Sequence, residues 1–219
     1  MTSLRTAAII RFGTAFAMLA SVVWQITSRV VNNVFRPDEY FSYFTIQTSL
    51  IAIVTLSVAG WFAWTGRKET RVLNIVRLSS VTFTVVVTLV YNLLLRGLAD
   101  DPKDGGYVWP VLPNEILHVW AAIFMLIDWM LSSRRINLRL RTIFWVLLFP
   151  LTWLIYSIIR GLAVNWWAYW FINPNEPAGI TGMVTYIIGI MLFLLTVASA
   201  LIGLQRITVR AFREPKVLP

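Results

Sequence analysis

The single histidine of this 219-residue chain is the side chain best suited to acid–base chemistry at neutral pH. His118 stands a few residues inside an apolar run that begins at Pro113-Asn114-Glu115 and ends near Leu131. Because a titratable group costs free energy to bury in lipid, a histidine at this depth is a candidate functional residue. The alternative is a histidine that only packs between helices. Glu115 shares its helical face, where the carboxylate can orient or charge the imidazole.

Hydroxyl, amide and arginine side chains recur at helical spacing in three other apolar runs. Spacings of three and four residues place such side chains on one face of a helix. Hydroxyls in membrane helices commonly bond to their own backbone or to a neighbouring helix, and arginines near helix ends reach out to the headgroups. These residues could therefore bind a ligand, or they could only hold the helices together and anchor them at the headgroups. They are Thr45, Thr48, Ser49 and Thr55; Ser80, Thr84, Thr88, Asn92 and Arg96; and Thr152, Tyr156 and Arg160.

This set of residue types suits ester hydrolysis. A threonine hydroxyl becomes a nucleophile when a base removes its proton, and histidine is the usual base. The oxyanion needs hydrogen-bond donors, for which Gln47, Asn92 and Tyr156 are candidates. A substrate carboxylate needs a cationic partner, for which Arg96 and Arg160 are candidates. The Gly-x-Ser-x-Gly turn of ordinary serine hydrolases does not occur in the sequence.

Composition identifies the class of protein. Hydrophobic residues make up 58% of the chain, the mean hydropathy is +0.71, and there are 11 tryptophans, which is typical of an integral membrane protein. The chain has no cysteine and one histidine, which excludes disulfides, thiol catalysis and a bis-histidine haem and argues against a zinc site. We therefore expect no metal and no cofactor. The net charge of +9 follows the loops, so we expect no nucleic-acid partner.

Six apolar runs approach the ~20 residues needed to cross a bilayer. They lie at about 7–28, 41–64, 75–98, 112–131, 142–162 and 180–203. The first contains Arg11 and has no small-residue cleavage site, so we interpret it as an uncleaved span. The prediction is an all-α integral membrane protein, a six-transmembrane-helix bundle that forms a single domain over residues 1–219.

The charges of the connections predict the orientation. The chain start, the second and fourth connections and the tail are rich in arginine and lysine. The connection 99–111 carries Asp100, Asp101 and Asp104 against Lys103, and the connection 163–179 carries only Glu176. By the positive-inside rule both termini are cytoplasmic and these two connections are external. We expect a multi-pass protein of the plasma (cytoplasmic) membrane.

Three other features carry structural predictions. The connection 163–179 is rich in tryptophan and tyrosine, which favour the headgroup level, so it anchors the chain there or roofs a cavity. Pro150 should bend or locally unwind the fifth span. Asp128 should pair with Arg77, Arg134 or Arg135.

Depth in the membrane brings the candidate residues into one layer. The spans that carry Thr45 and His118 both run inward, which puts Thr45 about 6 Å below the outer boundary at ~1.5 Å per residue and His118 at a similar depth. The spans that end near Arg96 and Arg160 run outward. We expect an outer-leaflet polar cavity among spans two to five, with Thr45 and His118 in one site. The layer comprises Thr45, Gln47, Thr48, Asn92, Arg96, Glu115, His118, Tyr156 and Arg160.

Short motifs carry a family resemblance. The segment Tyr43-Phe44-Thr45-Ile46-Gln47-Thr48-Ser49-Leu50, the Leu117-His118 entry to span four and the stretch from Pro150 to Pro174 resemble a bacterial six-span family often labelled Pr-six-Pr. The chain is also similar, more distantly, to the androgen-induced protein family of eukaryotic membrane hydrolases. That resemblance implies cleavage of fatty acid esters of hydroxy fatty acids, with Thr45 as the nucleophile and His118 as its partner.

Three functions remain open from the sequence. The first is an intramembrane hydrolase that cleaves a lipid-like ester with Thr45 and His118. The second is a small transporter or lipid-binding protein that uses the same cavity, and the third is a structural membrane subunit without a ligand. Membrane lipids and a lipid-like small molecule are the expected partners, and the sequence makes no prediction of the oligomeric state.

Overall fold

The computed structural model describes residues 4–98, 102–131 and 138–211, and the described chain is a bundle of helices without strands. Six of its helical segments are long and apolar enough to cross a membrane, which confirms the predicted all-α membrane bundle. These segments are Leu4–Val31, Phe44–Trp64, Arg71–Leu95, Val111–Leu131, Leu140–Val164 and Gly179–Arg206.

Several spans consist of more than one element. The first, second and last spans are single helices, α1 (Leu4–Val31), α3 (Phe44–Trp64) and α9 (Gly179–Ala211). The third is α4 (Arg71–Val90) followed by the π-helical turn η1 (Tyr91–Leu95). The fourth is α5 (Val111–Glu115), the π-helical turn η3 (Ile116–Trp120) and α6 (Ala121–Leu131). The fifth is η4 (Leu140–Thr142), α7 (Ile143–Val146) and α8 (Leu148–Val164). Short connecting elements are α2 (Pro37–Tyr40), η2 (Pro102–Asp104) and η5 (Trp170–Ile172).

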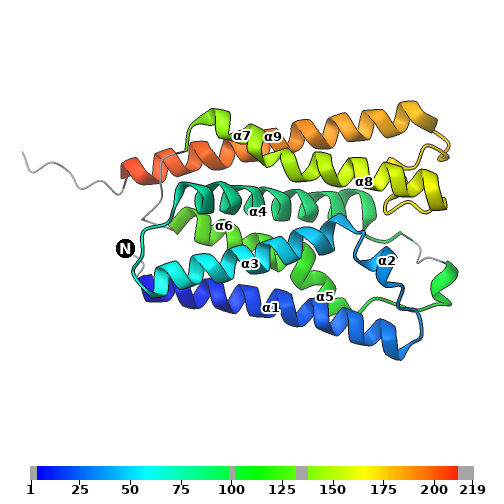
Figure 1. Ribbon diagram of the computed structural model, residues 1–219, viewed down its shortest axis with the longest axis horizontal. Coiled ribbons are helices and arrows are strands. Elements are labelled where there is room, and N and C mark those ends of the chain that lie inside the picture. Colours follow the sequence, from blue (N-terminus) through cyan, green and yellow to red (C-terminus); the bar gives the residue numbers. More distant parts are fainter. Residues whose placement is uncertain (1–3, 99–101, 132–137, 212–219) are drawn as a thin grey trace, which may run out of the picture.

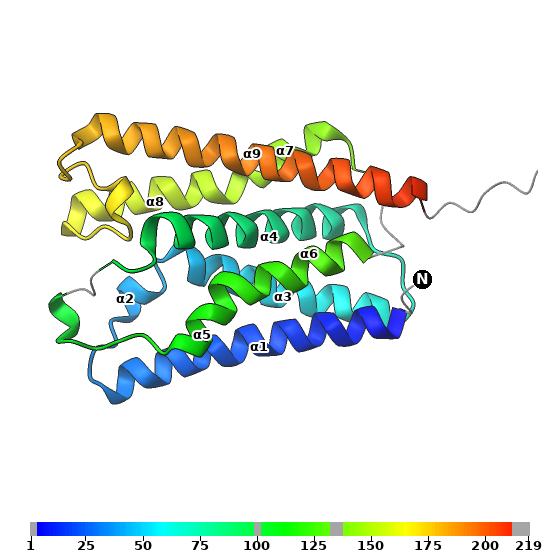
Figure 2. The ribbon, with the colours of Figure 1, turned by 180° about the vertical axis from the view of Figure 1, so that it is seen from behind.

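Helices α1, α3, α4 and α6 form the centre of the bundle. Helix α1 packs along α3 and also contacts α5 and α6, while α4 contacts α3, α6 and α9. Figures 1 and 2 show α8 and α9 along the side of α4 that faces away from α1. Helix α1 begins and α9 ends at the same end of the bundle, here called the terminal end. The opposite end holds α2, η2 and η5. That both termini are cytoplasmic stays a prediction.

Local sequence explains where the spans differ from their predicted bounds. The third span begins at Arg71 rather than 75 because Thr70 caps it, its hydroxyl accepting a hydrogen bond from the Leu73 N–H at 3.1 Å. The second begins at Phe44 rather than 41 because α2 and a turn precede it. The predicted disturbance near Pro150 is confirmed, since the helix is interrupted at Leu147, between α7 and α8. Pro150 lies in the first turn of α8 and has no backbone N–H to donate to a carbonyl of the preceding turn.

A closed ring of four charged side chains lies in the core near the terminal end. We call Arg11, Glu69, Arg77 and Asp128 the charge ring. Each carboxylate binds both arginines: Glu69 through Oε1 and Oε2, and Asp128 through Oδ1 and Oδ2. All four side chains are buried, with 2–7% of their surface exposed. The ring joins α1, the connection before α4, α4 and α6, so every charge in this part of the core is compensated.

The charge ring confirms one sequence prediction and extends it. Asp128 pairs with Arg77, as expected, and also with Arg11 of the first span. The other expected partners, Arg134 and Arg135, lie outside the described residues. The sequence did not assign a role to Glu69, which belongs to the connection rather than to a helix.

Candidate functional site

Two π-helical turns lie next to each other toward the opposite end of the bundle. They are η1, which ends the third span, and η3, which interrupts the fourth. Their proximity follows from the Tyr91 and His118 rings, one from each turn, which stack with centroids 4.0 Å apart and an interplanar angle of 24°. Single π-helical turns within α-helices are rare, and those that occur are often found at functional sites. This pair therefore marks the first candidate region.

Side-chain donors bond to backbone carbonyls at both π-helical turns. The Nδ1 atom of His118 lies 2.9 Å from the Asn114 carbonyl oxygen, and Asn92 Nδ2 donates to the Thr88 carbonyl at 2.7 Å. A carbonyl can only accept, so Nδ1 of His118 carries the proton. In the neutral imidazole Nε2 is then the atom with a free lone pair. The local structure thus selects the tautomer that a general base acting through Nε2 requires.

Polar side chains extend this region to the surface. The guanidinium of Arg96 binds Asn92 through Nε at 2.8 Å and Glu115 through Nη2 at 2.7 Å, and it lies over the Tyr91 ring at 4.8 Å. Asn114 donates to the Tyr91 hydroxyl at 2.8 Å. We call these residues the His118 cluster. Its members are Tyr91, Asn92, Arg96, Asn114, Glu115 and His118.

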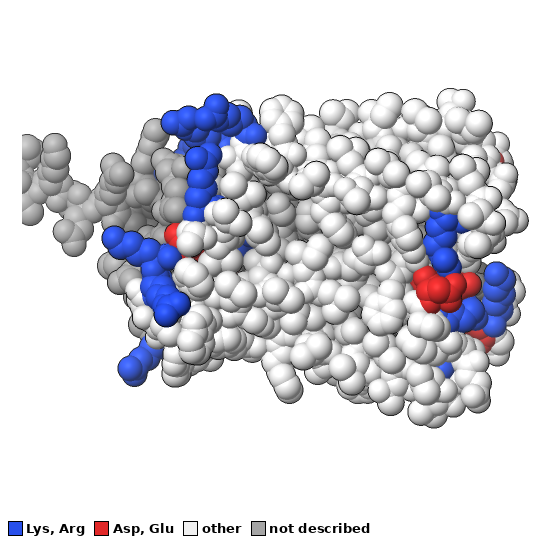
Figure 3. Space-filling model, in the orientation of Figure 1, with Lys and Arg blue, Asp and Glu red and all other residues white. Residues whose placement is uncertain are grey.

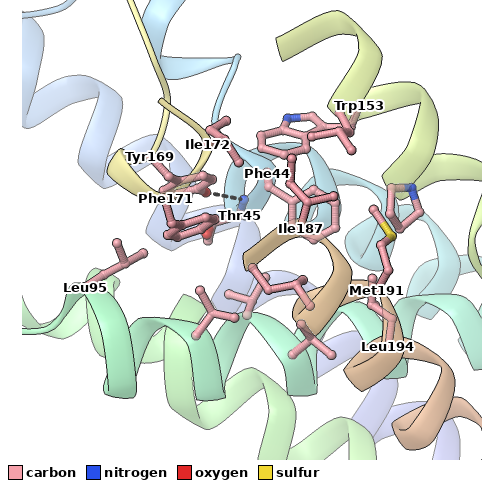
Figure 4. A pocket seen from close by; sticks show the side chains of 16 residues that line it. Phe44, Thr45, Leu95, Trp153, Tyr169, Phe171, Ile172, Ile187, Met191 and Leu194 are labelled. Atoms are coloured by element: carbon pink, nitrogen blue, oxygen red, sulfur yellow. Dashed lines mark hydrogen bonds between the residues drawn. The ribbon is translucent and has the colours of Figure 1, made fainter. Parts of the chain in front are cut away.

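The second candidate region is a pocket that contains Thr45. Figure 4 shows Thr45 beside Tyr169 and Phe44, with Leu95, Ile187 and Met191 around the space. The cavity volume is about 60 Å³. Apart from Thr45 and Tyr169, its lining is hydrocarbon or aromatic. It comprises Phe44, Thr45, Val86, Val87, Val90, Leu95, Pro150, Trp153, Leu154, Tyr169, Phe171, Ile172, Ile187, Ile190, Met191 and Leu194.

The aromatic connection between the last two spans forms one wall of this pocket. Tyr169, Phe171 and Ile172 line it, and the Tyr169 and Phe171 rings stack with centroids 5.1 Å apart. Trp170 packs edge-on against Tyr186 of α9 and donates to the Leu94 carbonyl at 3.3 Å. Residues of 163–179 thus cover the pocket, and anchoring of this connection at the headgroup level stays a prediction.

The polar atoms of the pocket lie where α3 begins. The Thr45 N–H donates to the Tyr169 hydroxyl at 3.4 Å. Burial raises the pKa of the Tyr169 phenol, although its contacts with Thr45 lower it in part. The phenol is therefore neutral at physiological pH, and it keeps its own proton to donate to a ligand oxygen.

A third group of polar side chains lies on α8. The Tyr156 hydroxyl is 2.6 Å from Ser42 Oγ, and Arg160 Nη2 binds Asp38 at 2.7 Å. The Arg160 guanidinium also lies 5.0 Å from the centre of the Trp166 ring. These contacts fasten α8 to the segment before α3.

The structure thus distributes the predicted layer over three places. Asn92, Arg96, Glu115 and His118 lie in the His118 cluster; Thr45 lies in the pocket; Tyr156 and Arg160 lie with Ser42 and Asp38. Gln47 donates to the Phe41 carbonyl at 2.8 Å, and Thr48 bonds to carbonyls of its own helix.

The pocket differs from the expected cavity in lining and in neighbours. It is apolar rather than polar, and α9 of the sixth span lines it in place of the fourth span. His118 is not among its lining residues, and no hydrogen bond joins Thr45 to His118 in the described chain. Helix α4 stands at both regions, because Val86, Val87 and Val90 line the pocket while the next residue, Tyr91, stacks on His118.

Sequence reasoning missed the aromatic partners of both regions. The sequence pattern predicts only an interfacial or roofing position for Tyr169 and indicates no role for Tyr91 beside His118. A tyrosine at the end of an apolar run was a usable signal, since a buried hydroxyl needs a hydrogen-bond partner.

No group of His, Asp and Glu side chains suited to a metal ion occurs among the described residues. No family model, curated protein or solved structure matches the chain.

Proposed function

We propose that this protein binds the acyl chain of a lipid-like molecule in the pocket between α3, α4, α8 and α9. The observation that supports this function best is the lining, which is hydrocarbon and aromatic apart from Thr45 and Tyr169. A cavity lined in this way offers water few partners and stays dry, so an acyl group fills it more favourably. Thr45 and Tyr169 then face the polar group of the ligand.

The size of the pocket limits what it holds. A cavity of about 60 Å³ exceeds the ~10–15 Å³ that one water molecule requires on the same measure, so it holds several groups of that size. This space receives part of one acyl chain. The rest of the ligand extends into the bilayer.

Filling the cavity tests this proposal. Ile187 lines the pocket, whereas the next residue, Ile188, is 54% exposed on the outside of α9. Ile187→Trp should abolish binding of isotope-labelled oleate, measured by native mass spectrometry of the purified protein. The matched variant Ile188→Trp adds the same indole outside the pocket and should bind as before. Equal binding by both variants would rule the pocket out as the site.

A second candidate function is hydrolysis of a fatty acid ester. Thr45 stands at the polar edge of an acyl-sized space, and the His118 tautomer leaves Nε2 available as a base. The more distant resemblance to the androgen-induced hydrolases supports the same two residues. The proposal requires His118 to reach Thr45, directly or through one water, in the substrate complex. Arg96 and Arg160 are the proposed partners of a substrate carboxylate.

The hydrolase proposal has its own test. Thr45→Ala and His118→Ala should each abolish hydrolysis of a fatty acid ester of a hydroxy fatty acid, and the double variant should lose little more, because nucleophile and base act as a unit. Thr48→Ala removes a buried hydroxyl one turn away that bonds only within α3, so it should keep the activity. An inactive wild-type protein that still binds oleate would leave lipid binding as the function.

A further inference from the structure

The terminal end of the bundle carries exposed positive charge that has no acidic counterpart on the described surface. Figure 3 shows arginine and lysine side chains gathered at this end. The two acidic side chains described here, Glu69 and Asp128, are buried in the charge ring. The exposed basic residues are Arg5, Arg67, Lys68, Arg71, Arg139, Arg141 and Arg206.

The arginines of the opposite end behave differently. Each of the four described there pairs with a carboxylate: Arg29 with Asp104, Arg36 with Glu39 and Asp104, Arg96 with Glu115, and Arg160 with Asp38. The described arginines of the opposite end are thus neutralised within the protein, whereas the exposed arginines of the terminal end are left for an external anion. Arg139 and Arg141 have no ion-pair partner in the part of the chain that the structure describes.

One segment of the terminal end combines these charges with apolar surface. In η4 and α7, Thr142 and Val146 are buried against the bundle, whereas Arg141 and Arg139, the residue before η4, are exposed. Phe144 and Trp145 are exposed by 65% and 63%. Exposed aromatic rings beside arginines are typical of a segment that lies at the boundary between headgroups and acyl chains.

A third arginine reaches the start of this segment from α9. The Arg206 guanidinium donates through Nη2 to the Leu138 carbonyl at 3.3 Å, next to Arg139. Arg206 therefore reaches the backbone of the segment that carries the exposed Arg139 and Arg141. Guanidinium is the side-chain group that binds phosphate oxygens in bidentate fashion.

We propose that Arg139, Arg141 and Arg206 form a binding site for the headgroup of an anionic phospholipid, with Phe144 and Trp145 against its acyl chains. The occupant is a lipid of the leaflet at the terminal end. This site is separate from the Thr45 pocket, which lies toward the opposite end, and it does not depend on the function proposed for that pocket.

Native mass spectrometry of the full-length protein in detergent, with phosphatidylglycerol or phosphatidylcholine added, tests this site. The wild type should retain phosphatidylglycerol at least tenfold more than phosphatidylcholine. Arg139→Gln/Arg141→Gln should lose that preference, and Arg139→Lys/Arg141→Lys should keep most of it. The control Arg67→Gln/Lys68→Gln removes the same charge from another connection at this end and should bind like the wild type.

Two results would overturn the proposal. One is an equal loss in the control, which would mean that the net charge of this end attracts the lipid without a defined site. The other is an unchanged preference in Arg139→Gln/Arg141→Gln, provided that gel filtration and thermal melting show all variants folded. Oleate binding, measured in the same samples, should be unaffected, which separates this site from the pocket.

Discussion

The guanidinium of Arg77 and the carboxylate of Asp128 pair across the contact between α4 and α6, with only 2% and 7% of their side-chain surfaces exposed. The pair belongs to the charge ring, in which Arg11 and Glu69 complete the circuit. Burying ions costs several kcal/mol each, and their mutual pairing, with the hydrogen bond from Arg11 to the Ala59 carbonyl, offsets this cost. Removal of one member should therefore cost far more than the loss of a surface ion pair.

Asp128→Asn tests this expectation. It should destabilise the protein by about 3–5 kcal/mol, because two buried arginines lose a shared negative charge. Glu115→Gln is the control: it breaks a pair whose side chains are 43% and 26% exposed, and it should cost ~0–1 kcal/mol. Thermal melting in detergent measures both, and comparable shifts in the two variants would contradict the role assigned to the ring.

Gly161 should be intolerant of a larger side chain. A Cβ at this position would lie 2.5 Å from ring atoms of Trp167, so Gly161→Ala must displace the tryptophan. Overpacking of this kind costs about 1–3 kcal/mol. Gly189→Ala, in α9 where nothing lies within 4 Å, should instead stabilise the helix by up to about 1 kcal/mol. Opposite shifts in melting temperature are expected; a stabilised Gly161→Ala would contradict the packing described.

The Arg160–Asp38 contact should be visible in an acid titration. The hydrogen bond from Arg160 holds the pKa of the Asp38 carboxyl below its usual 3.8. Because the folded pKa is lowered, the contribution of this pair to stability is present above pH 3.8 and is lost as the pH falls through the folded value. Carbon NMR of the Asp38 carboxyl should show the low pKa in the wild type and a pKa shifted upward in Arg160→Gln. Identical titrations would mean that the contact does not persist in solution.

Replacing His118 separates packing from chemistry. His118→Phe keeps a ring that can stack on Tyr91 but loses the hydrogen bond to the Asn114 carbonyl and the Nε2 lone pair. If His118 acts as a base, ester hydrolysis should fall at least a hundredfold in His118→Phe, with the melting temperature close to that of the wild type. Full activity in His118→Phe would leave the histidine a packing role only.

The orientation of the chain can be tested without removing native cysteines, since the sequence contains none. Single cysteines at Lys103 and Arg67, both exposed, lie at opposite ends of the bundle. A membrane-impermeant maleimide added to intact cells should label the cysteine at 103 and leave that at 67 unlabelled, as the positive-inside rule predicts. Labelling of the cysteine at 67 alone would mean that the orientation is the opposite of the predicted one.

The helices were predictable because hydropathy and length fix them almost independently of packing. A run of about 20 apolar residues has few alternatives to a membrane-spanning helix. Pro150 predicts the interruption of the fifth span, because proline lacks the N–H that a helical turn needs. The π-helical turns at Tyr91 and at His118 were not predictable, because an extra residue in a helical turn leaves no mark on an apolar run.

For the candidate site, the sequence predicted the level of the residues along the bundle but not the direction in which each side chain faces. Loop charges and span direction placed Thr45 and His118 in one half of the bundle, but the direction in which each faces depends on how the helices rotate about their axes. In the structure Thr45 faces Tyr169, and His118 faces Tyr91. That choice follows from contacts between distant segments, such as Trp153 donating to the Ser42 carbonyl at 2.9 Å.

The charge ring also bears on how the bundle responds to membrane voltage. A single elementary charge moved across 100 mV changes in energy by about 2.3 kcal/mol. Two arginines and two carboxylates sum to a formal charge of zero, so a small shift of the ring as a unit performs almost no electrical work. We therefore expect the packing of α1, α4 and α6 around these four charged side chains to be insensitive to membrane voltage.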